Sequence, residues 1–256
     1  MKIILISLLT FTLLGSSCIQ NAQKNSIREI VTINGSEQFF QPKMDSVIIS
    51  IDIDYPMDSS LISNNIRNYI ITTLLYPNHD SISNLPMPDL KDSILNRLYV
   101  RWYLKPVTMK DKIGQEPRRI HNHRCIKIIE SGVPSIRTFN WKEKEEIYVH
   151  GILDNTIESS NYSSISIDGK GISLLDIVNE NSIDKVLSLL RSKIEEYCIS
   201  NDKAYSDEAY SDLILTTSIC IINKKLHCEM KWGLPEDFEI DIPLVDLQEY
   251  LSIDIH

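Results

Sequence analysis

The sequence predicts an α+β fold in which an antiparallel β-sheet carries a few helices packed on one face. Three observations favour this class. Segments with strand-like alternation come in runs, the helical segments are few and grouped, and no internal repeat is evident. With 43% apolar and 24% charged residues among 256, the chain has the composition of a globular protein.

The folded part is expected to begin with a strand and two helices. Residues 47–53 (VIISIDI) alternate and are rich in β-branched side chains, which predicts a strand. Helices are predicted over residues 58–75, capped by Asp58 or Ser59, and over residues 89–105. Apolar side chains recur at helical spacing at Ile62, Ile66, Tyr69, Ile70, Thr73 and Leu74, and at Leu90, Ile94, Leu98 and Trp102.

Short strands and one long helix are expected to follow. The helix is capped by Ser182, runs to Cys198 and has a clear apolar stripe. A short helical segment is expected at residues 172–176, and another at residues 244–251. The predicted strands cover residues 123–130, 136–141, 145–153, 163–168, 212–222, 226–232 and 238–242.

The charge balance limits the classes of partner. A formal net charge of −9 argues against nucleic acid, because phosphate binding depends largely on clustered Lys and Arg. The chain has only eight Gly and no glycine-rich phosphate-binding motif. The signature motifs of serine hydrolases and zinc proteases do not occur either. We therefore expect no nucleic-acid partner, no cofactor and no catalytic residues.

Residues 1–17 have the layout of a secretory signal peptide. Lys2 supplies the positive start, an apolar run covers residues 3–14, and small residues precede Cys18. The apolar run is shorter than the roughly 20 residues that a membrane-spanning helix needs. We expect this segment to direct export from the cytoplasm and to be removed.

The cysteine after this segment resembles the acylated cysteine of a bacterial lipobox, although Gly15 stands where that motif commonly has Leu. On this interpretation Cys18 carries lipid, including palmitate, and anchors a lipoprotein to the cell envelope, at the outer membrane or the periplasmic face. The alternative is ordinary cleavage near Ser17, which would release a secreted protein. Residues 18–44 are polar, show no sustained periodicity and are predicted to be a tether.

Assigning the first of the five cysteines to lipid leaves four. Cys220 and Cys228 flank a hairpin turn that we expect to centre on Lys224, which would place the two side chains opposite each other on one face. Two interpretations stay open. The pair forms a disulfide in an oxidising compartment, or both residues are buried free thiols.

A short alternating motif could bind a metal ion. His121, His123 and Cys125 would share one face of a strand, and imidazole and thiolate are good ligands for zinc or copper. A fourth ligand such as His150 or His227 is conceivable. The preferred interpretation assigns no metal site and treats the histidines as surface residues beside several arginines.

Several motifs in the second half occur in a recognisable order. GKGISLLDIV at residues 169–178 precedes a helix, LILT at residues 213–216 opens a hairpin, and IDIPLVDL at residues 240–247 leads into Tyr250-Leu251. This order resembles the extracytoplasmic domain of the RsiV-type anti-sigma factors, which also occurs in PdaC-like peptidoglycan deacetylases. The resemblance divides the folded part into an N-terminal half at residues 45–168 and a C-terminal half at residues 169–256.

The resemblance implies a non-catalytic binding domain of the bacterial cell envelope. In RsiV-type proteins this domain is a receptor for lysozyme, and in PdaC-like enzymes catalysis belongs to a separate domain. The implied partners are a basic protein such as lysozyme or cell-wall glycan, and an acidic domain would attract a basic protein electrostatically. The alternative function is a metal-dependent envelope enzyme or metal-binding protein that uses His121, His123 and Cys125.

Overall fold

The structure is a computed structural model that describes residues 27, 29–40, 46–75, 87–104, 118–203, 219–230 and 238–254. The described residues form two compact units, one from those within 1–120, 149–151 and 167–169 and the other from those within 121–148, 152–166 and 170–256. Their boundary does not coincide with the one at residues 168 and 169 that the resemblance implies. The predicted signal peptide and Cys18 lie outside the described residues. Both units combine strands with helices, so the predicted α+β class is confirmed.

The first unit is built on a long hairpin. Strand β1 (Ile30–Phe40) runs antiparallel to β2 (Ser46–Pro56), in a register that extends from Ile30 opposite Pro56 to Phe40 opposite Ser46. The predicted alternation of β2 is confirmed, because every second side chain faces the core and is at most 2% exposed. These buried residues are Val47, Ile49, Ile51, Ile53 and Tyr55.

Strand β1 contradicts part of the prediction that residues 18–44 are a tether. It lies within residues 18–44, so this part of the tether prediction is wrong. Its alternation is weak because only Ile33 is buried, while Val31 and Phe39 are half-buried and most other side chains are exposed. The ring of Phe39 stacks on Tyr99 with the centroids 4.1 Å apart.

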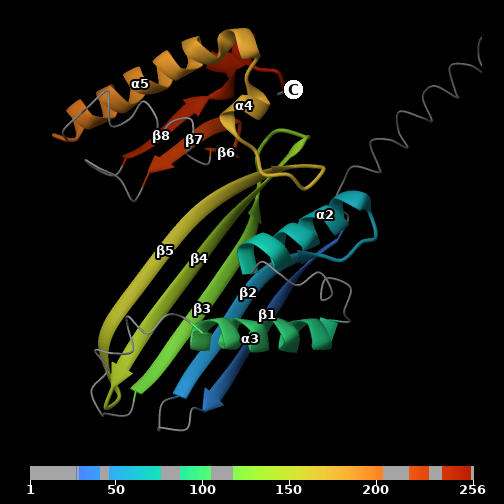
Figure 1. Ribbon diagram of the computed structural model, residues 1–256. Helices are drawn as coiled ribbons and strands as arrows, with labels where there is room; N and C mark the ends of the chain where they lie inside the picture. The colour runs from blue at the N-terminus through green and yellow to red at the C-terminus, as the bar shows by residue number, and fades with distance from the viewer. Residues whose placement is uncertain are drawn as a thin grey trace, which may run out of the picture. The chain divides into compact units, whose positions relative to one another are not determined.

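Helices α2 (Leu61–Tyr69) and α3 (Met87–Leu104) pack against this hairpin (Figure 1). A π-helical turn, η1 (Ile70–Leu75), continues α2. The cap of α2 is Ser60, one or two residues later than predicted. Its hydroxyl accepts a hydrogen bond from the amide of Ser63 at 3.1 Å. Seven side chains of the two predicted stripes are buried, namely Ile62, Ile66, Ile70, Leu74, Leu90, Ile94 and Leu98. The prediction is wrong at Thr73, which is exposed, and Tyr69 is only half-buried. Nothing is described of the side chain of Trp102.

Three long strands open the second unit in the order β3 (Arg118–Ile129), β4 (Ile136–Val149) and β5 (Ile152–Ser166). The three short strands predicted between residues 136 and 168 are wrong, because the chain forms two continuous strands there. These two strands meet at the turn His150-Gly151, whose φ angles of 50° and 81° are both left-handed. Two left-handed residues match the twist of a tight hairpin.

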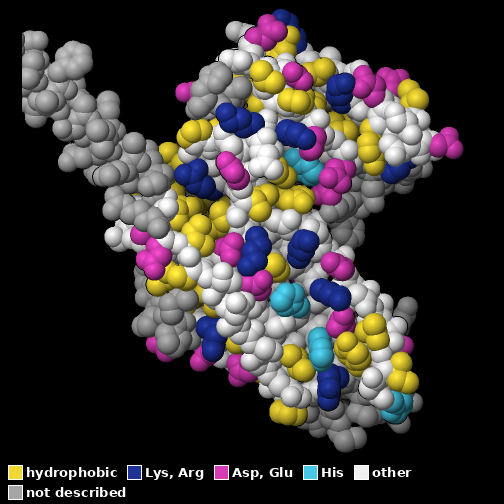
Figure 2. Space-filling model, turned by 180° about the vertical axis from the view of Figure 1, so that it is seen from behind, with side chains coloured by type: hydrophobic (Ala, Val, Ile, Leu, Met, Phe, Trp, Pro, Cys, Tyr) yellow, Lys and Arg dark blue, Asp and Glu magenta, His cyan; other side chains and the backbone are white. Residues whose placement is uncertain are grey.

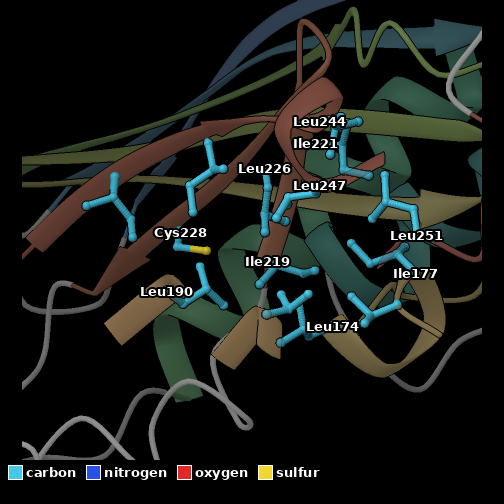
Figure 3. Close-up of a cluster of buried hydrophobic side chains, with 14 of the residues drawn as sticks. Leu174, Ile177, Leu190, Ile219, Ile221, Leu226, Cys228, Leu244, Leu247 and Leu251 are labelled. Atoms are coloured by element: carbon cyan, nitrogen blue, oxygen red, sulfur yellow. The ribbon is translucent and has the colours of Figure 1, made fainter. Parts of the chain in front are cut away.

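The second unit also contains a small antiparallel sheet of β6 (Ile219–Ile222), β7 (Lys225–Met230) and β8 (Phe238–Pro243). Helix α5 (Ile183–Ser200), the long helix predicted after Ser182, covers one face of this sheet. The segments α4 (Leu174–Ile177), η3 (Glu180–Ser182) and η4 (Leu244–Tyr250) complete the unit. Residues 212–218 and 231–232 of the predicted strands lie outside the described residues. The core between sheet and helices includes Leu174, Ile177, Leu190, Ile219, Ile221, Leu226, Leu244, Leu247 and Leu251 (Figure 3).

Two buried hydroxyl groups join the long strands to the small sheet. The hydroxyl of Thr138 on β4 donates to the carbonyl of Ile221 on β6 at 2.6 Å. The hydroxyl oxygen of Ser164 on β5 accepts from the amide of Ile221 at 2.9 Å, and the two hydroxyls lie 2.7 Å apart. Thr138 is 0% and Ser164 3% exposed. This hydroxyl clasp satisfies both backbone groups of Ile221 without a further strand.

Candidate functional site

Strand β3 separates its side chains into two chemically different faces. His121, His123 and Cys125 are half-buried on one face, as predicted from their alternation. Asn122 and Arg124 are buried on the opposite face. The alternation therefore places the predicted motif on the more accessible side of the strand.

A row of interacting side chains continues from this motif onto β4. The rings of His121 and Tyr148 lie 4.9 Å apart between centroids, and the Tyr148 hydroxyl donates to the Glu146 carboxylate at 2.9 Å. The ammonium group of Lys144 lies 2.6 Å from the same carboxylate. We call His121, His123, Lys144, Glu146 and Tyr148 the polar face. Figure 2 shows one face of the molecule on which histidine, basic and acidic side chains lie close together.

The charges within the polar face stabilise one another. The hydrogen bonds from Lys144 and then from Tyr148 lower the pKa of the Glu146 carboxyl. The same carboxylate raises the pKa of Lys144 and of Tyr148. Near neutral pH the row therefore presents an aromatic donor, a carboxylate and an ammonium group. This combination can bind the polar groups of a protein or of a glycan.

The polar face does not assemble the metal site that the alternative function needs. Among the described residues, no group of three or more His, Cys, Asp or Glu side chains is placed to hold a metal ion. His150 lies in the turn after β4, and His227 binds a carboxylate on a different sheet. The described residues therefore offer no ligand cluster for the metal-dependent alternative.

The opposite face of β3 and β4 contains a buried ionic cluster that the sequence analysis missed. The guanidinium group of Arg124 lies 2.7 Å from the carboxylate of Glu143. The side-chain amide of Asn122 donates to Glu143 at 3.0 Å and to Glu145 at 3.4 Å. Arg124 and Glu145 are 5% and 6% exposed. Because charges are costly to bury without partners, this cluster has a structural role.

The two cysteines proposed as a pair do not face each other. In the hairpin of β6 and β7, Cys220 lies opposite His227 and Cys228 lies opposite Ile219. Cys220 and Ile219 are consecutive, so the two thiols lie on opposite faces of the sheet. The expected facing arrangement is wrong because the turn has two residues instead of the three centred on Lys224. Both cysteines are free thiols, which agrees with the second interpretation.

Neither thiol is activated as a nucleophile. Burial raises the pKa of Cys220 and of Cys228 to about 12, so both remain protonated near neutral pH. His227 and Asp241 lie beside Cys220 on successive strands, and the His227 Nδ1 atom is 2.9 Å from the carboxylate of Asp241. The row has the residue types of a Cys-His-Asp site, but its thiol is buried and protonated. This row cannot be recognised in the sequence, because only the register between the strands brings Cys220, His227 and Asp241 together.

A cavity of about 340 Å³ lies at the loop between β3 and β4. Its wall comprises residues 129–134, Ile136 and Arg137. The guanidinium group of Arg137 donates to the carbonyls of Pro134 and Ile136 at 2.9 and 2.8 Å, and burial lowers its pKa. This arginine therefore fastens its own loop, and the cavity does not gather converging catalytic groups.

The described helices are too short or too polar to cross a membrane. Residues 1–17 and Cys18, on which the predicted export and lipid anchor depend, lie outside the described residues.

Comparison with known proteins finds solved structures with a similar fold. No protein-family model and no curated protein sequence matches the chain. A member of the DUF3298 family from Bacteroides fragilis superposes with a TM-score of 0.58 and 14% sequence identity, over 88% of this chain and 93% of that protein. A DUF3298 family protein from Pseudomonas aeruginosa gives a TM-score of 0.48 at 10% identity, over 88% and 96% of the two chains. The chain therefore shares the fold of the Bacteroides DUF3298 protein.

Proposed function

We propose that the chain is an exported, lipid-anchored protein of the bacterial cell envelope whose folded part binds a macromolecular partner and has no enzymatic activity. The signal-like residues 1–17 and Cys18 support export and anchoring. The resemblance to RsiV-type domains supports a binding role, and the fold of a DUF3298 protein is compatible with it.

The observation that carries the binding role is the polar face. Its carboxylate, ammonium, phenol and imidazole groups lie in one row across two neighbouring strands. The side chain of Lys144 is 42% exposed and that of Glu146 is 21% exposed, so both can contact a partner. An open surface of this kind suits a large partner better than a small molecule, which binds in a concave pocket.

Two partners fit this surface. A basic protein such as lysozyme is favoured by the net charge of −9, because opposite charges accelerate association. Cell-wall glycan is the second candidate, since phenol and imidazole rings can stack on sugars and the carboxylate can accept hydrogen bonds from their hydroxyls.

Binding to immobilised full-length protein tests the proposal, with lysozyme and soluble peptidoglycan fragments as probes. We expect saturable binding of one probe, weakened roughly tenfold by Glu146→Lys. The matched control is Glu195→Lys, which makes the same charge change at an exposed position on α5 and should bind normally. Equal binding by both variants, or turnover of either probe, would contradict the proposal.

The anchor is tested separately in a bacterial host. Labelled palmitate should be incorporated into the wild-type chain in the membrane fraction and not into a Cys18→Ser variant. Recovery of an unprocessed, unlabelled chain from the cytosol would refute export and anchoring without affecting the binding result.

A further inference from the structure

The outer edge of β5 is open near its hairpin turn. β5 stands at the end of the strand order of its sheet, and the seven consecutive residues Ile152–Glu158 are all exposed. Because successive side chains point to opposite faces of a strand, both faces of this stretch are accessible. We call residues 152–158 the open edge.

The other end of the same strand is closed by the chain itself. The amide of Ile172 donates to the carbonyl of Ser164 at 3.0 Å, and the amide of Ser166 donates to the carbonyl of Lys170 at 2.9 Å. Residues 170–172 thus extend the hydrogen bonding beyond β5. Within the described residues, no segment continues this pairing along the open edge.

The composition of the open edge combines aliphatic and acidic side chains. Exposed edges are protected from pairing with a second chain by charged side chains, Lys above all, or by Pro. The open edge contains neither residue, and Ile152, Leu153 and Ile157 are 73%, 49% and 40% exposed. Its only charged side chains are Asp154 and Glu158. The edge therefore offers backbone hydrogen bonds, aliphatic contacts and negative charge together.

We propose that the open edge is a docking strand for an extended segment of a protein partner in which Lys or Arg residues alternate with apolar residues. The segment adds to the sheet as a further strand, so that backbone hydrogen bonds supply affinity and the carboxylates select positive charge. This inference specifies how the proposed binding function is carried out. It rests on that function only in one respect, namely that the partner is a protein.

Charge complementarity decides between a basic partner and a second copy of the chain. In a pair of open edges, both strands would contribute only acidic charges, from Asp154 and Glu158 of each copy. Like charges on neighbouring strands destabilise the pairing, and the net charge of −9 adds long-range repulsion between copies. A basic strand replaces both repulsions by attraction.

Fluorescence anisotropy with the full-length protein tests this inference. The probe is a labelled, end-capped heptapeptide of alternating Lys and Val, compared with a Glu and Val peptide and with a Lys and Val peptide methylated at alternate backbone nitrogens. We expect the first peptide to bind and both others to bind at least roughly tenfold more weakly. The charge reversals Asp154→Lys and Glu158→Lys should each weaken binding, whereas Glu195→Lys should not.

Three outcomes would overturn the inference. They are absence of binding, equal binding of the methylated peptide, and a concentration-dependent dimer that Asp154→Lys alters. The proposed function is tested by Glu146→Lys, and Asp154→Lys is the open-edge variant that separates the two, because Glu158 also acts electrostatically on Lys144 of the polar face. Loss of lysozyme or glycan binding in Glu146→Lys, together with no peptide binding at the open edge, would remove this inference and leave the proposed function intact.

Discussion

The hydroxyl clasp predicts that the Thr138 hydroxyl contributes measurably to the stability of the second unit. Replacing Thr138 by Val keeps the shape of the side chain and removes only its hydroxyl. The carbonyl of Ile221 then loses its donor and the Ser164 hydroxyl loses its neighbour at 2.7 Å. A buried polar group without a partner costs about 1–3 kcal/mol. Because the Ser164 hydroxyl can rotate, only the carbonyl of Ile221 is left without its partner, and we expect the free energy of unfolding to fall by about 1–3 kcal/mol.

Urea denaturation followed by circular dichroism measures this loss. The matched control is Thr72→Val, which removes an exposed hydroxyl that donates to the carbonyl of Asn68, and it should change stability by less than about 0.5 kcal/mol. Ser164→Ala should also destabilise, and the double variant should lose less than the sum of the single losses. A loss below about 0.5 kcal/mol for Thr138→Val would show that the clasp does not stabilise the fold.

Three further perturbations have defined outcomes. Arg124→Met removes the cation that lies 2.7 Å from the Glu143 carboxylate, so the free energy of unfolding should fall by about 3 kcal/mol in urea denaturation, and an unchanged midpoint would argue against the ionic cluster. Gly132 has a φ of 75°, and an added Cβ would lie 2.5 Å from the side chain of Lys224, so Gly132→Ala should lower the thermal midpoint by several degrees. Burial raises the pKa of Cys220 and Cys228 from 9.0 to about 12, so the folded state keeps protons that the unfolded state releases. The free energy of unfolding should therefore fall as pH rises from about 9 towards 12, and a thiol reagent should label neither residue in the folded protein at about pH 8.

The elements that the sequence predicts well are those with one strongly apolar face. Residues 47–53 alternate without interruption, and α5 has an apolar stripe over its whole length, so burial alone identifies both. Strand β1 escapes the same reasoning because its partner β2 supplies its hydrogen bonds while most of its own side chains stay exposed. A strand that is held mainly by backbone hydrogen bonds has few apolar side chains, so the sequence pattern does not predict it.

The long strand β4 shows a second reason why the sequence pattern mispredicts an element. The charged run at residues 142–146 interrupts the apolar pattern, so the sequence predicts a break where the chain continues as one strand. Pairing of those charges explains the difference. Glu143 and Glu145 bind partners on β3, while Lys144 and Glu146 bind each other. Side chains with specific partners can occupy a continuous strand that composition alone would interrupt.

The candidate site was predictable only in part. The alternation of His121, His123 and Cys125 correctly places them on one face of a strand. The contribution of β4 to the polar face depends on the register between strands, which the sequence does not specify locally. The same dependence explains the error at Cys220 and Cys228, since a turn shorter by one residue moves a side chain to the other face of the sheet.

The buried, protonated thiols have a consequence for the order of events after the export proposed above. In an oxidising compartment, a cysteine forms a disulfide through its thiolate. Once the chain has folded, burial keeps Cys220 and Cys228 protonated and so suppresses their thiolates. Before folding, both thiols are open to oxidants and to other cysteines. In such a compartment, the small sheet therefore has to pack onto α5 faster than the two thiols form disulfides. Slow-folding variants should accumulate as disulfide-linked by-products.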